Sequence, residues 1–294
     1  MTIGGYTLHL IDAGRPGLDG GAMFGIVPKT LWEKRIPADA QNRIPLQMRC
    51  LLLEGHGRLI LVDCGLGDKI DDKFRRIYAV DPDAATLQGS LDAAGFGLDD
   101  VTDLVLTHLH FDHCGGATAR RGDRLRVVFP NAEVHVQRRH WDWAKESPRE
   151  GASFLAENLD PLEASGQLRL IGADQLGGSG LHGDPALFPN VEMVVVDGHT
   201  HGQQLVKVSG DEGTLLYAAD LLPTTAHVPL LWNMGYDVEP LKTVAEKEAL
   251  LPQAADGGWL VLFEHDPETA VARIVRTDRG FAVADASPDL RGSV

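Results

Sequence analysis

Cysteine is scarce in this sequence and is not arranged in pairs. Only three of the 294 residues are cysteines (Cys50, Cys64 and Cys114), and no two of them form a Cys-X-X-Cys pair. An odd number at such spacings argues against a disulfide framework and is typical of a protein from a reducing compartment. We therefore expect a cytoplasmic protein.

Long apolar runs are also absent. No stretch approaches the roughly 18 consecutive apolar residues that span a bilayer. Residues 1–11 lack the basic start and the apolar core of a signal peptide. The sequence thus predicts neither a membrane partner nor export.

Basic residues are in the minority. Lys and Arg number 27 against 42 Asp and Glu, which gives a formal charge of −15. Because nucleic-acid binding depends on clustered Lys and Arg, this balance argues against a nucleic-acid partner. Arg138 and Arg139 alone do not form such a cluster. Strongly anionic substrates are also disfavoured, unless bound metal ions reverse the local field.

The remaining composition is that of an ordinary globular protein. Apolar residues make up 44% of the chain and charged residues 23%, and a chain of this length can bury a sizeable core. We find no internal repeat, no low-complexity tract and no linker. A single domain spanning residues 1–294 is therefore expected.

The densest group of metal-capable side chains lies at residues 108–113, which read His-Leu-His-Phe-Asp-His and precede Cys114 and two glycines. These residues directly follow the apolar run 104–106, which we expect to be a strand. A strand that opens into a loop can direct alternate side chains, here His108 and His110, into one pocket. Imidazole nitrogen and carboxylate oxygen together suit zinc and neighbouring first-row ions. The segment therefore predicts a metal site.

Three further apolar runs lead to residues of the same kind. The runs 191–196, 214–219 and 259–263 precede His199, Asp220 and His265. Ligands commonly bind along one edge of an open sheet, where the ends of neighbouring strands meet. Four strands that each end in a metal-capable residue therefore predict one shared site.

Other segments indicate how the chain surrounds this site. Residues 1–47 predict an ordered N-terminal arm, with an edge strand near 3–11, that packs over the body or onto a partner subunit in a homodimer. Residues 138–165 predict a helical insertion that either caps a pocket or covers the sheet as an amphipathic pair. Residues 177–190 contain several Gly and Pro and predict a loop. Elsewhere the patterns predict hairpins at 50–62 and 205–219, helices at 86–94 and 240–251, short strands at 127–129 and 134–136, and two strands at 270–286.

These residues resemble the metallo-β-lactamase-fold hydrolases. The HxHxDH signature of that family corresponds to residues 108–113, and its Gly-His-Thr segment to residues 198–200. Its bridging Asp corresponds to Asp220, its last ligand to His265 and its acidic strand tip to Asp63. The resemblance covers residues 48–270, and it implies an α/β fold, the four-layer αβ/βα sandwich of two sheets between helices.

The resemblance also implies two bound divalent metal ions. It assigns seven ligands, of which one carboxylate is shared: His108, His110 and His199 for the first ion, Asp112, His113 and His265 for the second, and Asp220 for both. Zinc is the expected metal, with manganese, iron or cobalt as alternatives. Two such ions that share a water lower its pKa towards neutrality, so that a hydroxide is the nucleophile. Asp112 and Asp220 are the expected catalytic carboxylates.

Residues 141–143, 224–229 and 232–236 resemble the quorum-quenching lactonases and related esterases within that family. His201 and Gln203 stand where proline and histidine are common, which affects this subgroup assignment and not the ligand set. We therefore expect a small-molecule ester or lactone substrate, with N-acyl homoserine lactones favoured. His227 and Tyr236 are candidate substrate contacts, and Cys114 and Tyr217 are expected to serve in packing.

Several other functions fit the same motifs. An arylesterase, a phosphotriesterase or a thioester hydrolase would use the same ligands. A mononuclear iron dioxygenase would hold one metal ion per chain and would leave Asp112, His113 and His265 with less to do. An RNA-processing nuclease would need a basic surface that the composition does not provide, and the intact ligand set disfavours a non-catalytic metal-binding protein.

Overall fold

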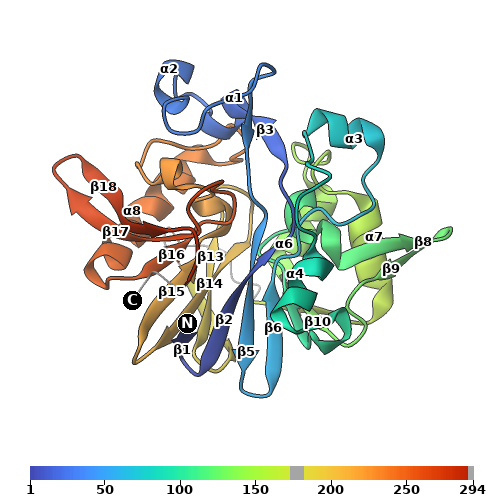
Figure 1. Cartoon of the computed structure of the whole chain (residues 1–294). Helices are drawn as coiled ribbons and strands as arrows, with labels where there is room; N and C mark the ends of the chain where they lie inside the picture. The colour runs from blue at the N-terminus through green and yellow to red at the C-terminus, as the bar shows by residue number, and fades with distance from the viewer. Residues whose placement is uncertain (173–181, 291–294) are drawn as a thin grey trace.

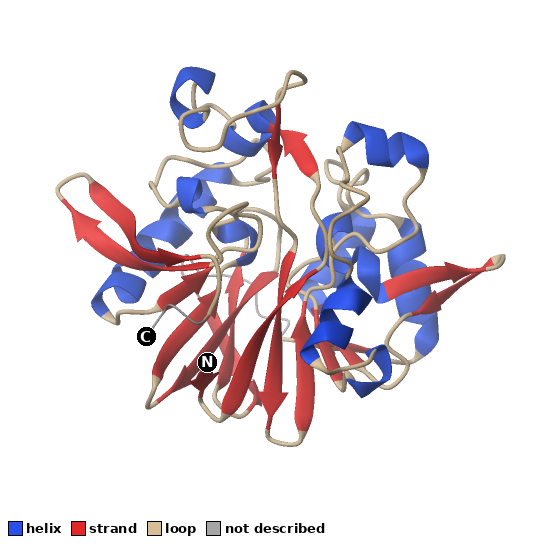
Figure 2. Ribbon diagram, in the orientation of Figure 1, coloured by secondary structure: helices blue, strands red, loops and turns tan. Residues whose placement is uncertain are grey.

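Two twisted β-sheets face each other at the centre of the molecule, and helices lie on their outer sides (Figure 1). This computed structural model describes residues 1–172 and 182–290. Colouring by secondary structure shows the strands gathered in the middle and the helices around them (Figure 2). The predicted four-layer α/β sandwich is confirmed.

The first sheet has the strand order β1-β2-β5-β6-β7-β10-β11. Its strands are β1 (Thr2–Ile3), β2 (Tyr6–Asp12), β5 (Arg49–Gly55), β6 (Arg58–Val62), β7 (Asp103–Val105), β10 (Glu133–Gln137) and β11 (Leu168–Ile171). Both faces of β5 are buried: Leu51 and Leu53 contact the second sheet, whereas Cys50 and Leu52 contact the helical layer. This explains why β5 reads as a continuous apolar run and not as an alternating one.

The second sheet contains its strands in the order of the sequence. They are β12 (His182–Phe188), β13 (Val191–Val196), β14 (Gln203–Gly210), β15 (Gly213–Tyr217), β16 (Leu260–Leu262), β17 (Val271–Thr277) and β18 (Gly280–Ser287). The pair β15 and β16 is parallel, and so is the pair β6 and β7 of the first sheet. The long connection between β15 and β16 contains α8 (Pro240–Asp256), which packs against β17.

Helix α4 (Leu87–Ala94) has a cap at each end. The Thr86 side chain accepts a hydrogen bond from the backbone N–H of Gly89, and Gly95 ends the helix in a left-handed conformation. The insertion at 138–165 forms α6 (Arg138–Glu146) and α7 (Ala156–Ser165). Trp141, Leu159 and Leu162 bury this pair against the first sheet. This matches the expectation of an amphipathic pair that covers the sheet. Among the described residues, no helix combines the length and apolarity needed to cross a membrane.

The N-terminal arm packs over the body of the same chain. Its elements are β3 (Gly17–Asp19), α1 (Gly20–Phe24), α2 (Lys29–Trp32) and β4 (Arg43–Pro45). Phe24 stacks between Trp32 and His227, at ring-centroid distances of 5.2 and 4.8 Å. The arm is shorter than 1–47, because β1 and β2 at its start belong to the first sheet. A contact with a second subunit stays a prediction.

Two local expectations were wrong. Residues 182–188 are not part of a loop but form β12, which pairs with β13; residues 173–181 of the expected loop lie outside the described part. The strand expected at 127–129 ends at Val127, as β9 (Arg124–Val127), and pairs with β8 (Thr118–Arg121) in a separate hairpin. In both cases a strand partner supplies backbone hydrogen bonds that local composition does not reveal.

Candidate metal centre

The loops that follow the strands bring the predicted ligands together. His108, His199, Asp220 and His265 each lie three residues after the last residue of a strand: β7, β13, β15 and β16. His110 immediately precedes the short helix α5 (Phe111–Cys114), which contains Asp112 and His113. The structure thus brings all seven side chains together at the same edge of the paired sheets.

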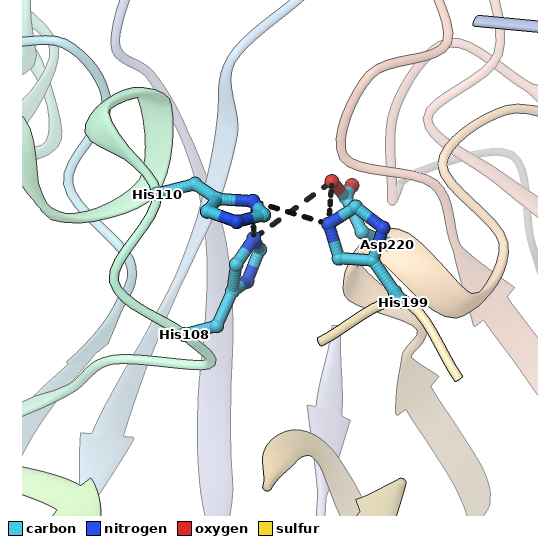
Figure 3. Close-up of side chains that lie close together, drawn as sticks. All are labelled: His108, His110, His199 and Asp220. Atoms are coloured by element: carbon cyan, nitrogen blue, oxygen red, sulfur yellow. Dashed lines mark hydrogen bonds and ion pairs between the residues drawn. The ribbon is translucent and has the colours of Figure 1, made fainter. Parts of the chain in front are cut away.

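One group consists of His108, His110, His199 and Asp220, whose ligand atoms lie within 4.8 Å of one another (Figure 3). The distance from His108 Nε2 to His110 Nδ1 is 3.0 Å, and that from His110 Nδ1 to His199 Nε2 is 3.2 Å. Nitrogens that share a tetrahedral zinc ion at about 2.0–2.1 Å would lie roughly 3.3 Å apart. The spacing of these three atoms therefore fits a common ion.

A second group consists of Asp112, His113 and His265. His113 Nε2 and His265 Nε2 are 3.1 Å apart. The Asp220 carboxylate reaches both groups, because Oδ2 lies 3.2 Å from His199 Nε2 and Oδ1 lies 3.2 Å from His265 Nε2. Asp220 Oδ1 is buried and has no hydrogen-bond donor among the described residues. This is the geometry expected of a carboxylate that bridges two ions.

The outward nitrogen of every ring has its own partner. His110 Nε2 lies 2.9 Å from Glu150, His199 Nδ1 3.0 Å from Asp237, His265 Nδ1 2.9 Å from the Gln47 carbonyl and His113 Nδ1 3.0 Å from Asp63. His108 Nδ1 lies 3.1 Å from Thr107 Oγ1, which itself donates to Asp63. Since these partners accept hydrogen bonds, the outward nitrogens carry the protons and the inward nitrogens carry lone pairs. Within each group, inward lone pairs at these distances repel one another unless positive charge lies between them.

The electrostatics of the centre lead to the same conclusion. Although burial opposes a charged ring, the Asp220 carboxylate raises the pKa of His199 to about 10 and that of His265 to about 9. The cluster therefore strongly favours positive charge, which either protons or metal ions can supply. The residues present fit divalent metal ions.

Asp63 supports the centre through its contacts with His113 and Thr107. Its carboxylate accepts hydrogen bonds from the Thr107 backbone N–H at 2.7 Å and from the Thr107 hydroxyl at 2.6 Å. Its backbone has a φ of +57°, a strained value for a residue with a side chain. Tyr217 is fully buried nearby and donates to the Arg49 carbonyl, while Cys114 donates to the Leu109 carbonyl. Both residues have the packing positions expected of them.

A cavity of about 250 Å³ reaches the two groups. Its wall is mainly apolar and aromatic, with Leu18 and Met23 from the arm, Tyr78, Phe111, Met234 and Tyr236. The loop between α6 and α7 adds Arg149, Glu150 and Ser153, so the insertion also borders the cavity. A larger cavity of about 340 Å³ near Met48 and Leu87 contains none of the seven predicted ligands.

The two candidate substrate contacts occupy different places. Tyr236 lines the cavity, and burial raises the pKa of its phenol well above the usual value. His227 lies behind the wall: it is 1% exposed, and its ring nitrogens are 2.8 Å from Thr224 Oγ1 and from the Met23 carbonyl. Any effect of His227 on a substrate must therefore pass through Met23 or its neighbours in this structure.

Sequence reasoning missed the residues that hold the ligands. Glu150, Asp237, Gln47 and His140 contact ligands or ligand loops from 30 or more positions away in the chain, and no local motif identifies them. Glu264 does have a local signal, since it directly precedes His265. Its Oε2 atom lies 3.1 Å from His113 Nδ1.

Comparisons with known proteins agree with this geometry. The sequence profile of the metallo-beta-lactamase superfamily matches residues 43–265. The chain belongs to this superfamily. It is therefore a hydrolase of the metal-dependent kind, and its His/Asp clusters support binding of divalent metal ions.

Individual relatives cover nearly the whole chain. An N-acyl homoserine lactonase of a Bacillus species is 25% identical over 89% of this chain and 93% of its own length. A probable metal-dependent hydrolase of Staphylococcus aureus has a similar structure, with a TM-score of 0.85 and 27% identity over 97% of this chain and 98% of its own. The dizinc quorum-quenching lactonase AidC, bound to the product N-hexanoyl-L-homoserine, shares the fold at a TM-score of 0.77 and 21% identity over 97% and 95%.

Proposed function

We propose that this protein is a dinuclear metal-dependent hydrolase that opens lactones or cleaves esters, with N-acyl homoserine lactones as the favoured substrate class. The observation that carries this proposal is the Asp220 carboxylate, which joins two groups of inward-facing histidines at the end of a largely apolar cavity. The lactonase of Bacillus, a relative along most of the chain, supports the substrate class.

The proposed ligands follow the two groups. His108, His110 and His199 would hold one ion, Asp112, His113 and His265 would hold the other, and Asp220 would serve both. Zinc suits this nitrogen-and-oxygen set and is the metal of the AidC lactonase, while manganese, iron or cobalt would also fit. When bound, such a pair lowers the pKa of a shared water towards neutrality and polarises the substrate carbonyl.

The residues of this chain have distinct tasks in the proposed reaction. Asp112 is 8% exposed and borders the cavity, so its carboxylate can take a proton from the attacking water and pass it to the oxygen of the leaving alcohol. Tyr236 remains protonated at neutral pH and can donate a hydrogen bond to an oxygen of the substrate. Met23, Phe111 and Met234 exclude water around an apolar acyl group.

The charges around the cavity suit a neutral substrate. Asp112, Asp220 and Glu150 border it, and Arg149 adds a single cation. A neutral lactone or ester is not repelled by these carboxylates, whereas a strongly anionic substrate would depend on the bound metal ions and Arg149 to offset them.

A substrate panel with the metal-loaded enzyme tests the proposal. We expect kcat/KM to be highest for N-acyl homoserine lactones, lower for simple lactones and aryl esters, and lowest for phosphotriesters. Asp220→Asn should abolish most of the activity, whereas Asp256→Asn, at an exposed ion pair with Arg276, should not. If kcat/KM for an aryl ester or a phosphotriester were ten times that for N-acyl homoserine lactones, the proposed substrate class would be wrong and that compound class would take its place. One metal ion per chain without hydrolysis would instead indicate the dioxygenase alternative.

A further inference from the structure

His140, a buried histidine outside the ligand set, connects the two loops that carry the three histidines of the first group. His140 is fully buried in the first turn of α6. Its Nε2 atom accepts a hydrogen bond from the Leu109 backbone N–H at 2.8 Å, and its Nδ1 atom lies 2.8 Å from the His201 carbonyl. Leu109 lies between His108 and His110, and His201 is two residues after His199.

These contacts allow only one form of the imidazole. Nε2 faces an N–H group and must therefore be the unprotonated nitrogen, whereas Nδ1 faces a carbonyl oxygen and must carry the proton. A doubly protonated ring would point an N–H at the Leu109 N–H. The opposite tautomer would lose both hydrogen bonds, the one from the Leu109 N–H and the one to the His201 carbonyl. A side chain that served only to fill space would not need two such matched contacts.

The surroundings of α6 fix its distance from the His199 loop. Both oxygens of Asp197 lie 2.6 Å from Arg139 Nη1 of α6, and Asp197 also accepts from the Gly202 N–H at 2.8 Å. Gly202 has a φ of +76°, and a Cβ atom at this position would lie 2.8 Å from the His140 backbone nitrogen. The loop 197–202 therefore contacts the start of α6 closely and in one conformation.

We propose that His140 is a positioning residue that sets the separation of the two ligand loops, and with it the affinity of the first metal site. His108 and His110 come from one of these loops and His199 from the other. The second group does not depend on this separation, because Asp112 and His113 lie in α5 and His265 follows β16. Loss of outer contacts of this kind typically lowers metal affinity about 10–100-fold.

The test compares His140→Phe, which keeps the approximate size of the ring, with His140→Gln, whose amide oxygen can still accept from the Leu109 N–H. Competition of the metal-loaded proteins against a chromophoric chelator measures the affinity of each ion. The visible spectrum of the cobalt(II) form reports the geometry of the sites. We expect His140→Phe to weaken one of the two ions about 10–100-fold and to change the cobalt spectrum, with His140→Gln between this variant and the wild type.

His135→Phe is the matched control. His135 is another buried histidine, but its Nε2 atom contacts Asp103, away from the ligand loops. This variant should bind both ions as the wild type does. Unchanged affinities and an unchanged cobalt spectrum in His140→Phe would overturn the proposal, and so would equal losses in His140→Phe and His135→Phe.

A measurement on the wild-type protein covers the case in which His140→Phe fails to fold. The Leu109 amide of the metal-loaded enzyme should be strongly protected from hydrogen exchange, and His140→Gln should lose part of this protection. Rapid exchange at Leu109 in the wild type would contradict the proposed bridge. None of these readouts requires a substrate, so they are independent of whether the enzyme proves to be a lactonase.

Discussion

The Glu150 carboxylate holds His110 in place, with Oε1 at 2.9 Å from Nε2 of the imidazole. Its Oε2 atom accepts a hydrogen bond from Trp143 Nε1 at 2.5 Å and another from the Ser147 hydroxyl at 3.0 Å. Although burial opposes its charge, these contacts, above all that with His110, lower the pKa of Glu150 to about 2. Glu150 therefore stays ionised at neutral pH and directs His110 Nδ1 toward His108 and His199.

Replacing this carboxylate should weaken the first metal site. We expect Glu150→Gln to lower the affinity of one ion about 10–100-fold, because the amide is uncharged and can present its NH2 group to His110. Metal content after dialysis against a weak chelator measures the effect. Glu163→Gln, at an exposed ion pair with Lys145, is the control. Full metal retention in Glu150→Gln would show that His110 does not need this partner.

Removal of the metal should affect both activity and stability. Ions that bind the folded protein and not the unfolded chain stabilise it by about 4 kcal/mol at a thousandfold excess over Kd. We therefore expect strong chelation to abolish hydrolysis and to lower Tm by several degrees, and added zinc to restore both. Calorimetry and an activity assay on the same sample measure Tm and the rate of hydrolysis before chelation, after chelation and after zinc is added back. Turnover that continues under strong chelation would exclude the proposed chemistry.

Tyr236 and His227 should behave differently when they are replaced. Loss of the Tyr236 hydroxyl in Tyr236→Phe should lower kcat/KM about fivefold with little change in Tm, because Tyr236 lines the cavity and a single hydrogen bond is worth about 1 kcal/mol. His227→Phe should mainly lower Tm, because it removes buried hydrogen bonds to Thr224 and Met23. Steady-state kinetics and thermal unfolding separate the two effects. The reverse pattern would reassign the substrate contact to His227.

A buried lysine should make stability depend on pH. Lys247 Nζ donates to the carbonyls of Pro229 and Trp232, and burial lowers its pKa to about 7. In the unfolded chain the pKa is about 10.4, so the unfolded state binds more protons between these values. The contribution of Lys247 to the free energy of unfolding therefore rises with pH from 7 to about 10, by at most about 1.4 kcal/mol per pH unit.

Lys247→Met should remove this rise. Urea unfolding at pH 7, 8 and 9 measures the slope in the variant and in the wild type. Lys145→Met, at a partly exposed lysine, should keep the wild-type slope. An equal slope in wild type and Lys247→Met would mean that Lys247 stays charged in the folded protein throughout this range.

The metal ligands could be predicted from the sequence because they follow apolar strands closely along the chain. His108, His199, Asp220 and His265 each come three residues after a strand, and apolar runs reveal strands well when both faces are buried. The metal-capable residue after each run therefore indicated a common edge. The resemblance supplied the grouping of the seven ligands into two sets, which the distances support.

The features that could not be predicted from the sequence depend on contacts between segments that lie far apart in the chain. His140 contacts Leu109 and His201, and Glu150 contacts His110, through a fold that no local pattern encodes. Strand β12 was missed because Gly and Pro in 177–190 indicate a turn, whereas pairing with β13 decides the backbone of 182–188. His227 was predicted to contact substrate because the sequence does not reveal that Phe24, about 200 residues earlier, stacks on its ring.

The seven ligands are divided between the two sheets, and this division has a consequence for folding. His108, His110, Asp112 and His113 follow β7 of the first sheet, whereas His199, Asp220 and His265 follow strands of the second. A nascent chain that ends before Val191 holds four of these side chains and neither complete group. Only a molecule whose two halves have docked in the correct register can retain both ions, so metal content would report directly on correct assembly.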